Sequence, residues 1–229
     1  MDKMPFTELG LLASVTSITG IEDLCNNAMK SKAAAVCVPP MYLKLVKSIT
    51  SNTPVKTAAV VGFPFGYNAI ESKLAETVLA IVDGANEIHL MINLIAIKNK
   101  DWQYLARELN TLLAVVRKSE RSLIVIIEAG TLNEEEIIAC CDIYGAAGVD
   151  FIKTATGFSN EPVTIKTLTF IRRHLADAVG IIYVYEQTLK YNVNDLKQAG
   201  VDRIAYLDNT NSVKEIENVQ GGMVFENKL

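Results

Sequence analysis

The segment Gly148-Val-Asp-Phe-Ile-Lys153-Thr-Ala-Thr-Gly-Phe158 contains the junction from which the whole fold is built. Its first glycine suits the left-handed end of a helix, and the short apolar run that follows is typical of a buried strand. The run ends in small residues that allow a ligand to approach the backbone. Gly84 and Gly200 also stand between a helical pattern and a strand pattern, so the same junction recurs along the chain.

Short β-rich runs alternate with helical patterns eight times. One helical pattern is residues 102–117, with leucines at helical spacing. Such alternation implies parallel strands joined by crossover helices, in an open doubly wound sheet or a closed barrel. No G-x-G-x-x-G motif follows the first strand, and eight strands in 229 residues favour the barrel. We therefore predict an α/β fold, a (β/α)8 TIM barrel, as a single domain over residues 1–229. The predicted strands are Phe6–Leu11, Ala33–Val38, Thr57–Gly62, Glu87–Asn93, Leu123–Glu128, Phe151–Thr154, Gly180–Tyr185 and Arg203–Leu207.

Composition narrows the possible partners. The net charge is −4 and the chain has no basic block, which argues against nucleic acid and anionic membrane surfaces as partners. No apolar run approaches the ~20 residues that span a bilayer, and the first residues lack a signal-peptide core. The four cysteines show no metal-binding spacing, which predicts reduced thiols, no metal and a cytoplasmic location.

Lys153 is the candidate nucleophile. Burial in an apolar strand disfavours the ammonium form of a lysine, and a neutral amine can attack a carbonyl group to form a Schiff base. We therefore expect a lowered pKa for Lys153. The alternative is an ammonium that extends to the solvent at the strand end.

Strand alternation predicts which polar side chains accompany Lys153. Ile88, Leu90 and Ile92 form an aliphatic face that suits the helix layer, so His89 should point into the barrel. In a barrel, His89, Glu128 and Lys153 would then converge at the C-terminal mouth. Two alternatives stay open: His89 as a core histidine satisfied by a neighbour, and Glu128 as a cap for strand-end amides or a partner of Lys153.

Five segments in order resemble the deoxyribose-phosphate aldolase family of class I, Schiff-base aldolases. They are Ala34-Ala-Val-Cys37-Val-Pro-Pro40, Val60-Val-Gly62-Phe-Pro64-Phe-Gly66 followed by Lys73 and Glu76, Gly84-Ala-Asn-Glu-Ile88, Ile126-Ile-Glu128, and the Lys153 strand with Thr154-Ala-Thr-Gly157. The resemblance implies a (β/α)8 barrel that reversibly cleaves 2-deoxyribose 5-phosphate into glyceraldehyde 3-phosphate and acetaldehyde. It implies a lysine imine at Lys153 and no cofactor. Cys37, Glu128, Thr156 and Gly157 are the expected substrate-binding residues, and a homodimer is an expectation of the same kind.

The chain departs from the family pattern where the chemistry would lie. His89 stands where the family has a proton-transfer aspartate, Ile182 where it has a second lysine, and Ile124 where it has a further lysine. Glu8 stands roughly where the family has an aspartate. The glycine-rich phosphate turns are replaced by Tyr185-Glu-Gln187 and Ala205-Tyr-Leu-Asp208, whose bulk and carboxylates oppose a dianion.

Three hypotheses follow. The first is an aldolase-like lyase that acts on a small aldehyde or sugar, with Lys153 as nucleophile and His89 as proton shuttle. The second is a catalytically silent barrel that binds a ligand or a partner protein. The third is another Schiff-base enzyme of the transaldolase kind, which no motif favours. The substitutions predict weak or absent activity on 2-deoxyribose 5-phosphate.

Overall fold

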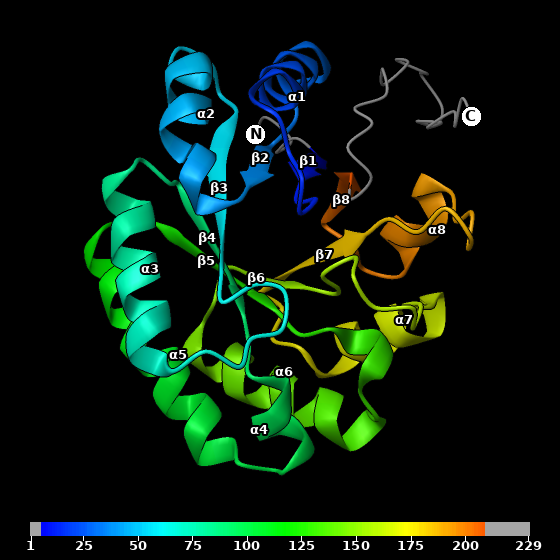
Figure 1. Cartoon of the computed structure of the whole chain (residues 1–229). Helices are drawn as coiled ribbons and strands as arrows, with labels where there is room; N and C mark the ends of the chain where they lie inside the picture. The colour runs from blue at the N-terminus through cyan, green and yellow to red at the C-terminus, as the bar shows by residue number, and fades with distance from the viewer. Residues whose placement is uncertain (1–5, 209–229) are drawn as a thin grey trace.

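The computed structural model describes residues 6–208, which form eight strands surrounded by helices (Figure 1). The strands are β1 (Thr7–Leu11), β2 (Ala35–Val38), β3 (Lys56–Val61), β4 (Glu87–Met91), β5 (Ser122–Ile126), β6 (Phe151–Lys153), β7 (Gly180–Val184) and β8 (Arg203–Asp208). The α-helices are α1 (Ile18–Ser31), α2 (Leu43–Thr50), α3 (Ile70–Val82), α4 (Leu94–Lys98), α5 (Trp102–Lys118), α6 (Glu134–Ala147), α7 (Ile165–His174) and α8 (Val193–Gln198). Two 3-10 turns, η1 (Pro40–Tyr42) and η2 (Ala129–Thr131), follow β2 and β5.

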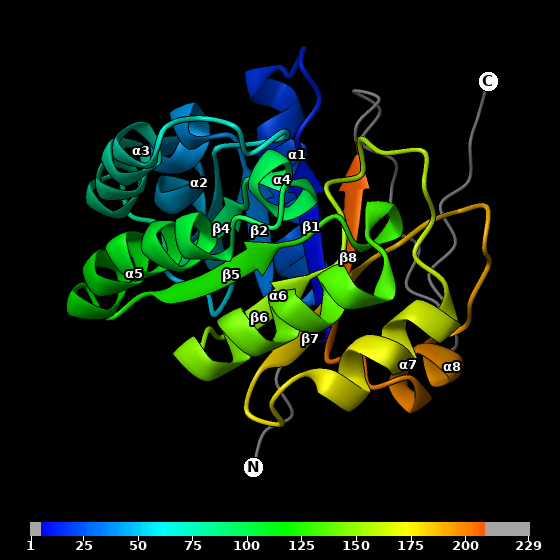
Figure 2. The same ribbon diagram turned by 90° about the horizontal axis from the view of Figure 1, so that it is seen from below.

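Each strand pairs in parallel with its neighbour in sequence, and β8 pairs with β1 to close the sheet. The helices lie around the outside of this closed sheet (Figure 2). The predicted barrel is therefore confirmed, and every predicted strand agrees with the observed one to within two residues. The expectation that one domain runs from residue 1 to residue 229 extends beyond the described residues at both ends.

Local sequence signals explain the unit that carries Lys153. Helix α6 begins with a capping box in which Asn133 and Glu136 satisfy each other's backbone amides. It ends at Gly148, whose φ of 66° lies in the left-handed region that glycine adopts without strain. The chain then enters β6 with Lys153 as its last residue. This order of helix, glycine and strand delivers Lys153 to the C-terminal end of the barrel.

The barrel interior has an apolar part and a charged part. The apolar part, here called the interior cluster, consists of Leu12, Ala35, Cys37, Ala58 and Val60, with Phe63 and Leu207 packed against it. The charged part is described below. Within residues 6–208, no helix has the length and apolar character needed to cross a membrane.

Candidate active site

Lys153 is buried inside the barrel. Its side chain is 1% exposed, and its Nζ donates to Oε1 of Glu8, on β1, over a distance of 2.6 Å. The same Nζ lies 3.4 Å from Nδ1 of His89 on β4. The alternative of an ammonium that extends to solvent is therefore wrong, because two side chains of opposite strands enclose the amine.

The expected direction of the Lys153 pKa is also wrong. Burial opposes the ammonium, but the carboxylate of Glu8 and the side chain of Cys37 outweigh it and raise the pKa of Lys153 above its ordinary value. Burial would likewise raise the pKa of Glu8, yet Lys153, His89 and Arg203 together lower it. The two groups therefore rest as an ion pair.

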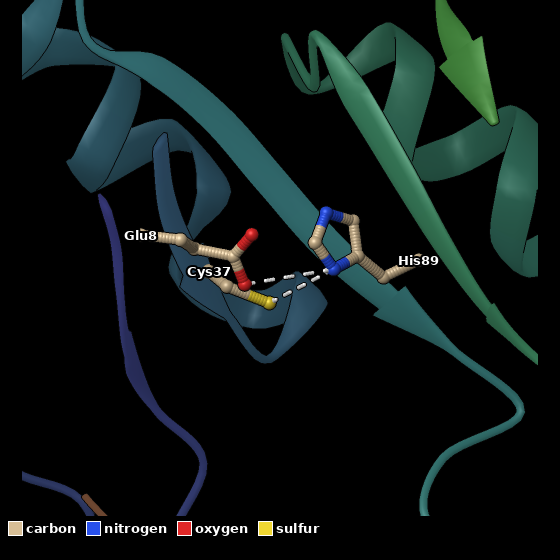
Figure 3. A group of neighbouring side chains, drawn as sticks. All are labelled: Glu8, Cys37 and His89. Atoms are coloured by element: carbon tan, nitrogen blue, oxygen red, sulfur yellow. Dashed lines mark hydrogen bonds and ion pairs between the residues drawn. The ribbon is translucent and has the colours of Figure 1, made fainter. Parts of the chain in front are cut away.

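His89 points into the barrel, as strand alternation predicts (Figure 3). Its Nδ1 lies 3.7 Å from Sγ of Cys37 and 3.9 Å from Oε1 of Glu8, and its Nε2 lies 3.4 Å from Oε2 of Glu87. Burial opposes the imidazolium, but Cys37 and Glu8 outweigh it and raise the pKa of His89 to about 9. His89 is therefore a core histidine with satisfied nitrogens that is also in contact with the candidate nucleophile.

Glu87 and Arg203 belong to the same interior network and were missed in the sequence. Arg203 donates to both oxygens of Glu87, at 2.7 Å and 3.2 Å. Its Nη1 also lies 3.4 Å from Oε2 of Glu8. Burial opposes the Glu87 carboxylate, but hydrogen bonds and charges from His89 and Arg203 hold its pKa well below the usual range. Glu87 precedes His89 by two residues, so the same alternation places it on the inner face. No comparable signal pairs it with Arg203.

Glu128 has partners of its own at the end of β5. Its Oε2 accepts from the backbone N–H of Thr156 at 3.0 Å and from the Thr156 hydroxyl. Glu128 thus caps a strand-end amide, whereas Lys153 pairs with Glu8. Its other oxygen, Oε1, is buried without a hydrogen-bond partner in the described part of the chain. Burial raises the pKa of Glu128 against the opposing bonds from Thr156.

The backbone of the same region is shaped for a tight approach. Glu128 adopts φ 48° and ψ 54°, a left-handed conformation that is uncommon outside glycine and occurs at functional sites. Gly157, four residues after Lys153, has φ 80°. The expected small-residue turn is therefore present.

Glu8, Cys37 and His89 also resemble a metal-ligand set, since their donor atoms all lie within 4.8 Å of one another (Figure 3). A carboxylate, a thiol and an imidazole are donors that zinc accepts. The Lys153 ammonium, however, already contacts both Glu8 and His89, and Arg203 contacts Glu8 from the other side. Two side-chain cations therefore already contact this cluster.

Comparison with known proteins now gives the family. The family model of DeoC/LacD aldolases matches residues 5–200. The chain belongs to the DeoC/LacD aldolase family. It is 35% identical over 194 residues to the deoxyribose-phosphate aldolase of Clostridium botulinum (strain Eklund 17B), covering 85% of this chain and 86% of that one. It is 34% identical to the deoxyribose-phosphate aldolase of Caldicellulosiruptor saccharolyticus, covering 87% and 91%.

Solved structures agree with this assignment. The aldolase QR15 shares 30% identity and a TM-score of 0.80 with this chain, covering 91% of it and 92% of QR15. The deoxyribose-phosphate aldolase of Aeropyrum pernix, described as tetrameric, matches in fold with a TM-score of 0.78 at 21% identity, covering 90% and 86%. The protein is thus a deoxyribose-phosphate aldolase-like TIM barrel.

Buried aliphatic side chains lie next to Lys153, and two of them, Ile182 and Ile124, stand at the positions at which the family resemblance led us to expect lysines. Ile182 on β7 is the direct neighbour of Lys153 in the sheet register, and Ile126 is its neighbour on β5. Ile124 lies two residues before Ile126 on β5, where it pairs in register with Phe151. All three isoleucines are fully buried. Lys153 therefore has hydrocarbon on both flanks and meets its charged partners only across the barrel.

Proposed function

We propose that this protein is a Schiff-base aldolase that acts on a small aldehyde or sugar through Lys153. The observation that supports this most is the fully buried Lys153, whose Nζ lies within 3.4 Å of both a carboxylate and an imidazole. Glu8 Oε1, at 2.6 Å, is placed to accept a proton from the ammonium. The free amine then adds to the carbonyl carbon, and loss of water from the carbinolamine gives the imine.

His89 is the proposed proton shuttle. Its pKa of about 9 keeps it protonated at neutral pH, so it enters the reaction as an acid. Its Nδ1 lies 3.4 Å from the Nζ on which the carbinolamine forms, so His89 can donate a proton to the hydroxyl that leaves as water. The neutral imidazole can then exchange a proton with the carbon next to the imine. Glu87, bonded to Nε2 of His89, stabilises the imidazolium between transfers.

The remaining site residues are proposed to bind substrate. Cys37 lies beside the His89 ring, and Glu128, Thr156 and Gly157 lie where β5 and β6 end. The unpartnered Oε1 of Glu128 can accept a hydrogen bond from a substrate hydroxyl. Neither nucleic acid nor a membrane is among the proposed partners. A homodimer and a cytoplasmic location are proposed on the family resemblance and the four free cysteines.

A catalytically silent, ligand-binding barrel is the second candidate, and one observation favours it. Lys153 rests as half of an ion pair with a raised pKa, and the positions of the family's other lysines beside it are aliphatic. A nucleophilic amine must first lose its proton, and nothing adjacent on β5 or β7 promotes that loss through like-charge repulsion.

Reductive trapping separates the two candidates. The protein is treated with acetaldehyde and borohydride, and the modified peptides are identified by mass spectrometry. We expect labelling at Lys153 that exceeds labelling at Lys73, an equally buried lysine outside the barrel interior. The Lys153→Met variant should lose the label. An unmodified Lys153 in folded protein would favour the catalytically silent, ligand-binding barrel. We also expect weak or absent turnover of 2-deoxyribose 5-phosphate.

A further inference from the structure

We propose that the mouth of the barrel recognises an aldehyde with an uncharged, hydrocarbon tail, and that Phe63 and Phe158 form the surface on which this tail lies. The inference rests on the proposed function of Lys153, whose carbonyl substrate it specifies. It assigns to the mouth a substrate class opposite in character to a sugar phosphate.

The loops around the mouth carry few positive charges. In a parallel barrel the loops that follow the strands form the mouth. Within residues 6–208, the seven loops after β1 to β7 contain three carboxylates, Glu128, Glu161 and Glu186, and a single cation, Lys190. A phosphate dianion needs cations or a cluster of free backbone N–H groups, as at glycine-rich turns. These seven loops carry more negative than positive side chains, which disfavours such a group.

Aromatic side chains from two of these loops are in contact with each other. Phe63 follows β3 and Phe158 follows β6, and their rings meet edge to face with centroids 5.4 Å apart. Phe158 is 44% exposed. In the same loop as Phe63, Phe65 and Tyr67 stack at 5.5 Å and are more than half exposed. Exposed aromatic surface grouped in this way is typical of a binding surface.

The aromatic surface continues into the barrel towards the reactive lysine. Phe63 packs on the interior cluster, which includes Leu12, Cys37 and Val60. Cys37 is in turn 3.7 Å from the His89 nitrogen that contacts Lys153. Apolar surface therefore leads from Phe158 at the rim to the edge of the charged network. A carbonyl group at Lys153 would leave the rest of its molecule against hydrocarbon.

The position of Phe158 in the chain also supports the assignment. It directly follows the turn Thr154-Ala-Thr-Gly157, which begins after Lys153. Its ring is held by the Phe63 contact, and its backbone N–H donates to the Thr156 hydroxyl at 3.1 Å. The side chain is thus fixed close in sequence to Lys153 without being one of the groups that react.

Chain-length dependence of imine trapping tests the proposal. Acetaldehyde, propanal, butanal and hexanal are compared with glyceraldehyde and glyceraldehyde 3-phosphate, each rate at Lys153 divided by the rate with a free model amine. We expect half-saturation to fall by roughly fourfold for each methylene that becomes buried. We also expect glyceraldehyde 3-phosphate to label less than glyceraldehyde. Absence of a length effect, or preference for the phosphate, would overturn the inference.

Two variants at one position sharpen the test. Phe158→Lys should remove the preference for hexanal and increase labelling by glyceraldehyde 3-phosphate relative to glyceraldehyde, whereas Phe158→Leu should retain the hydrocarbon preference. Labelling by acetaldehyde, which has no tail to lie on this surface, is the reference rate by which the other aldehydes are divided for each variant.

An unreactive ligand makes the test independent of catalysis. Saturation-transfer NMR with 1-hexanol should show binding that ethanol lacks and that Phe158→Lys weakens. If Lys153 never forms an imine, the proposed function fails while 1-hexanol still decides the character of the mouth. No hexanol contact in the parent protein would refute the apolar mouth even if acetaldehyde labels Lys153.

Discussion

Two lysines are buried within residues 6–208, and their electrostatic surroundings differ. Lys153 lies inside the barrel, 2.6 Å from Glu8, and Lys73 lies outside it on α3, 2.7 Å from Glu108 on α5. Both are at most 1% exposed. Yet the pKa of Lys153 is raised, whereas burial lowers the pKa of Lys73 against the opposing effect of Glu108.

The difference lies in what surrounds each pair. Arg203 and His89 favour the charged form of Glu8, so that carboxylate is ionised and holds Lys153 as an ammonium. Glu108 has only Lys73 and one backbone bond to oppose its burial, and its pKa is raised. The charged forms of the outer pair are therefore less strongly favoured than those of the inner pair. Lys73 also donates to the Met91 carbonyl at 2.7 Å.

This contrast shows that burial alone does not set the state of a lysine. A carboxylate at the same distance favours the ammonium strongly only where other charges keep that carboxylate ionised. For a Schiff-base mechanism the inner network opposes loss of the ammonium proton, because it stabilises the charged form of Lys153. It also supplies the groups that the reaction needs, because Glu8 can accept a proton and His89 can donate one.

The largest expected effect comes from removing the carboxylate of each pair. Glu8→Gln leaves a buried ammonium without its main partner and should lower the free energy of unfolding by about 3–5 kcal/mol. Glu108→Gln should cost about 1–3 kcal/mol, because burial already disfavours the ammonium of Lys73 and its second partner, the Met91 carbonyl, remains. Urea denaturation of both variants measures the difference, with circular dichroism as the check on folding. Equal losses would contradict the contrast between the pairs.

The pH dependence of stability tests the inner network through His89. Its pKa of about 9 in the folded protein exceeds the ordinary value of 6.5, so its contribution is present below pH 6.5 and is lost as pH rises through about 9. The shift corresponds to roughly 3 kcal/mol. The difference in unfolding free energy between the parent and His89→Gln should shrink by this amount between pH 6 and pH 10. NMR titration in a His174→Gln background follows His89 directly, and a midpoint near 6.5 would refute the shift.

Placing a second cation beside Lys153 should make the inner lysine behave more like the outer one. Ile182→Lys puts an ammonium at the neighbouring register position, which lowers the pKa of Lys153 by like-charge repulsion. Each unit of lowering gives about tenfold more free amine until the pKa reaches the assay pH. The pH profile of acetaldehyde trapping measures this, with Ile182→Met as the uncharged control.

His89→Asp added to Ile182→Lys should increase trapping further by restoring a carboxylate to the proton path. The new buried ammonium also costs stability, so circular dichroism must precede the assay. A folded double variant that labels Lys153 no better than its parent would show that these two positions do not account for the state of the lysine.

The smallest effect is expected when the outer pair is replaced as a whole. Lys73→Met combined with Glu108→Leu should leave the unfolding free energy within about 1 kcal/mol of the parent, because apolar groups of similar size fill the space without an unpaired charge. The single variants, measured in the same denaturation series, should each be less stable than the double variant. A double variant that is the least stable of the three would show that the outer pair contributes net stability that apolar packing does not replace.

The sequence by itself determined the architecture and the orientation of several site residues. Strand bounds and the closed barrel follow from apolar periodicity and glycine-ended helices, which are local signals. The inward direction of His89 follows from the alternation of Ile88, Leu90 and Ile92. The aliphatic neighbour of Lys153 on β7 could also be predicted, because Ile182 occupies a position that the family resemblance identifies.

The partners and charge state of Lys153 were decided only by the tertiary structure. Its carboxylate partner, Glu8, is 145 residues away in sequence, and Glu87 and Arg203 meet across 116 residues. Closure of the sheet brings β1, β4, β6 and β8 around one interior, a convergence that no local pattern encodes. A pKa depends on separations of a few ångströms between ionised groups and on the water that burial removes. The sequence could therefore place Lys153 inside the barrel but not predict that its amine would rest there as an ammonium.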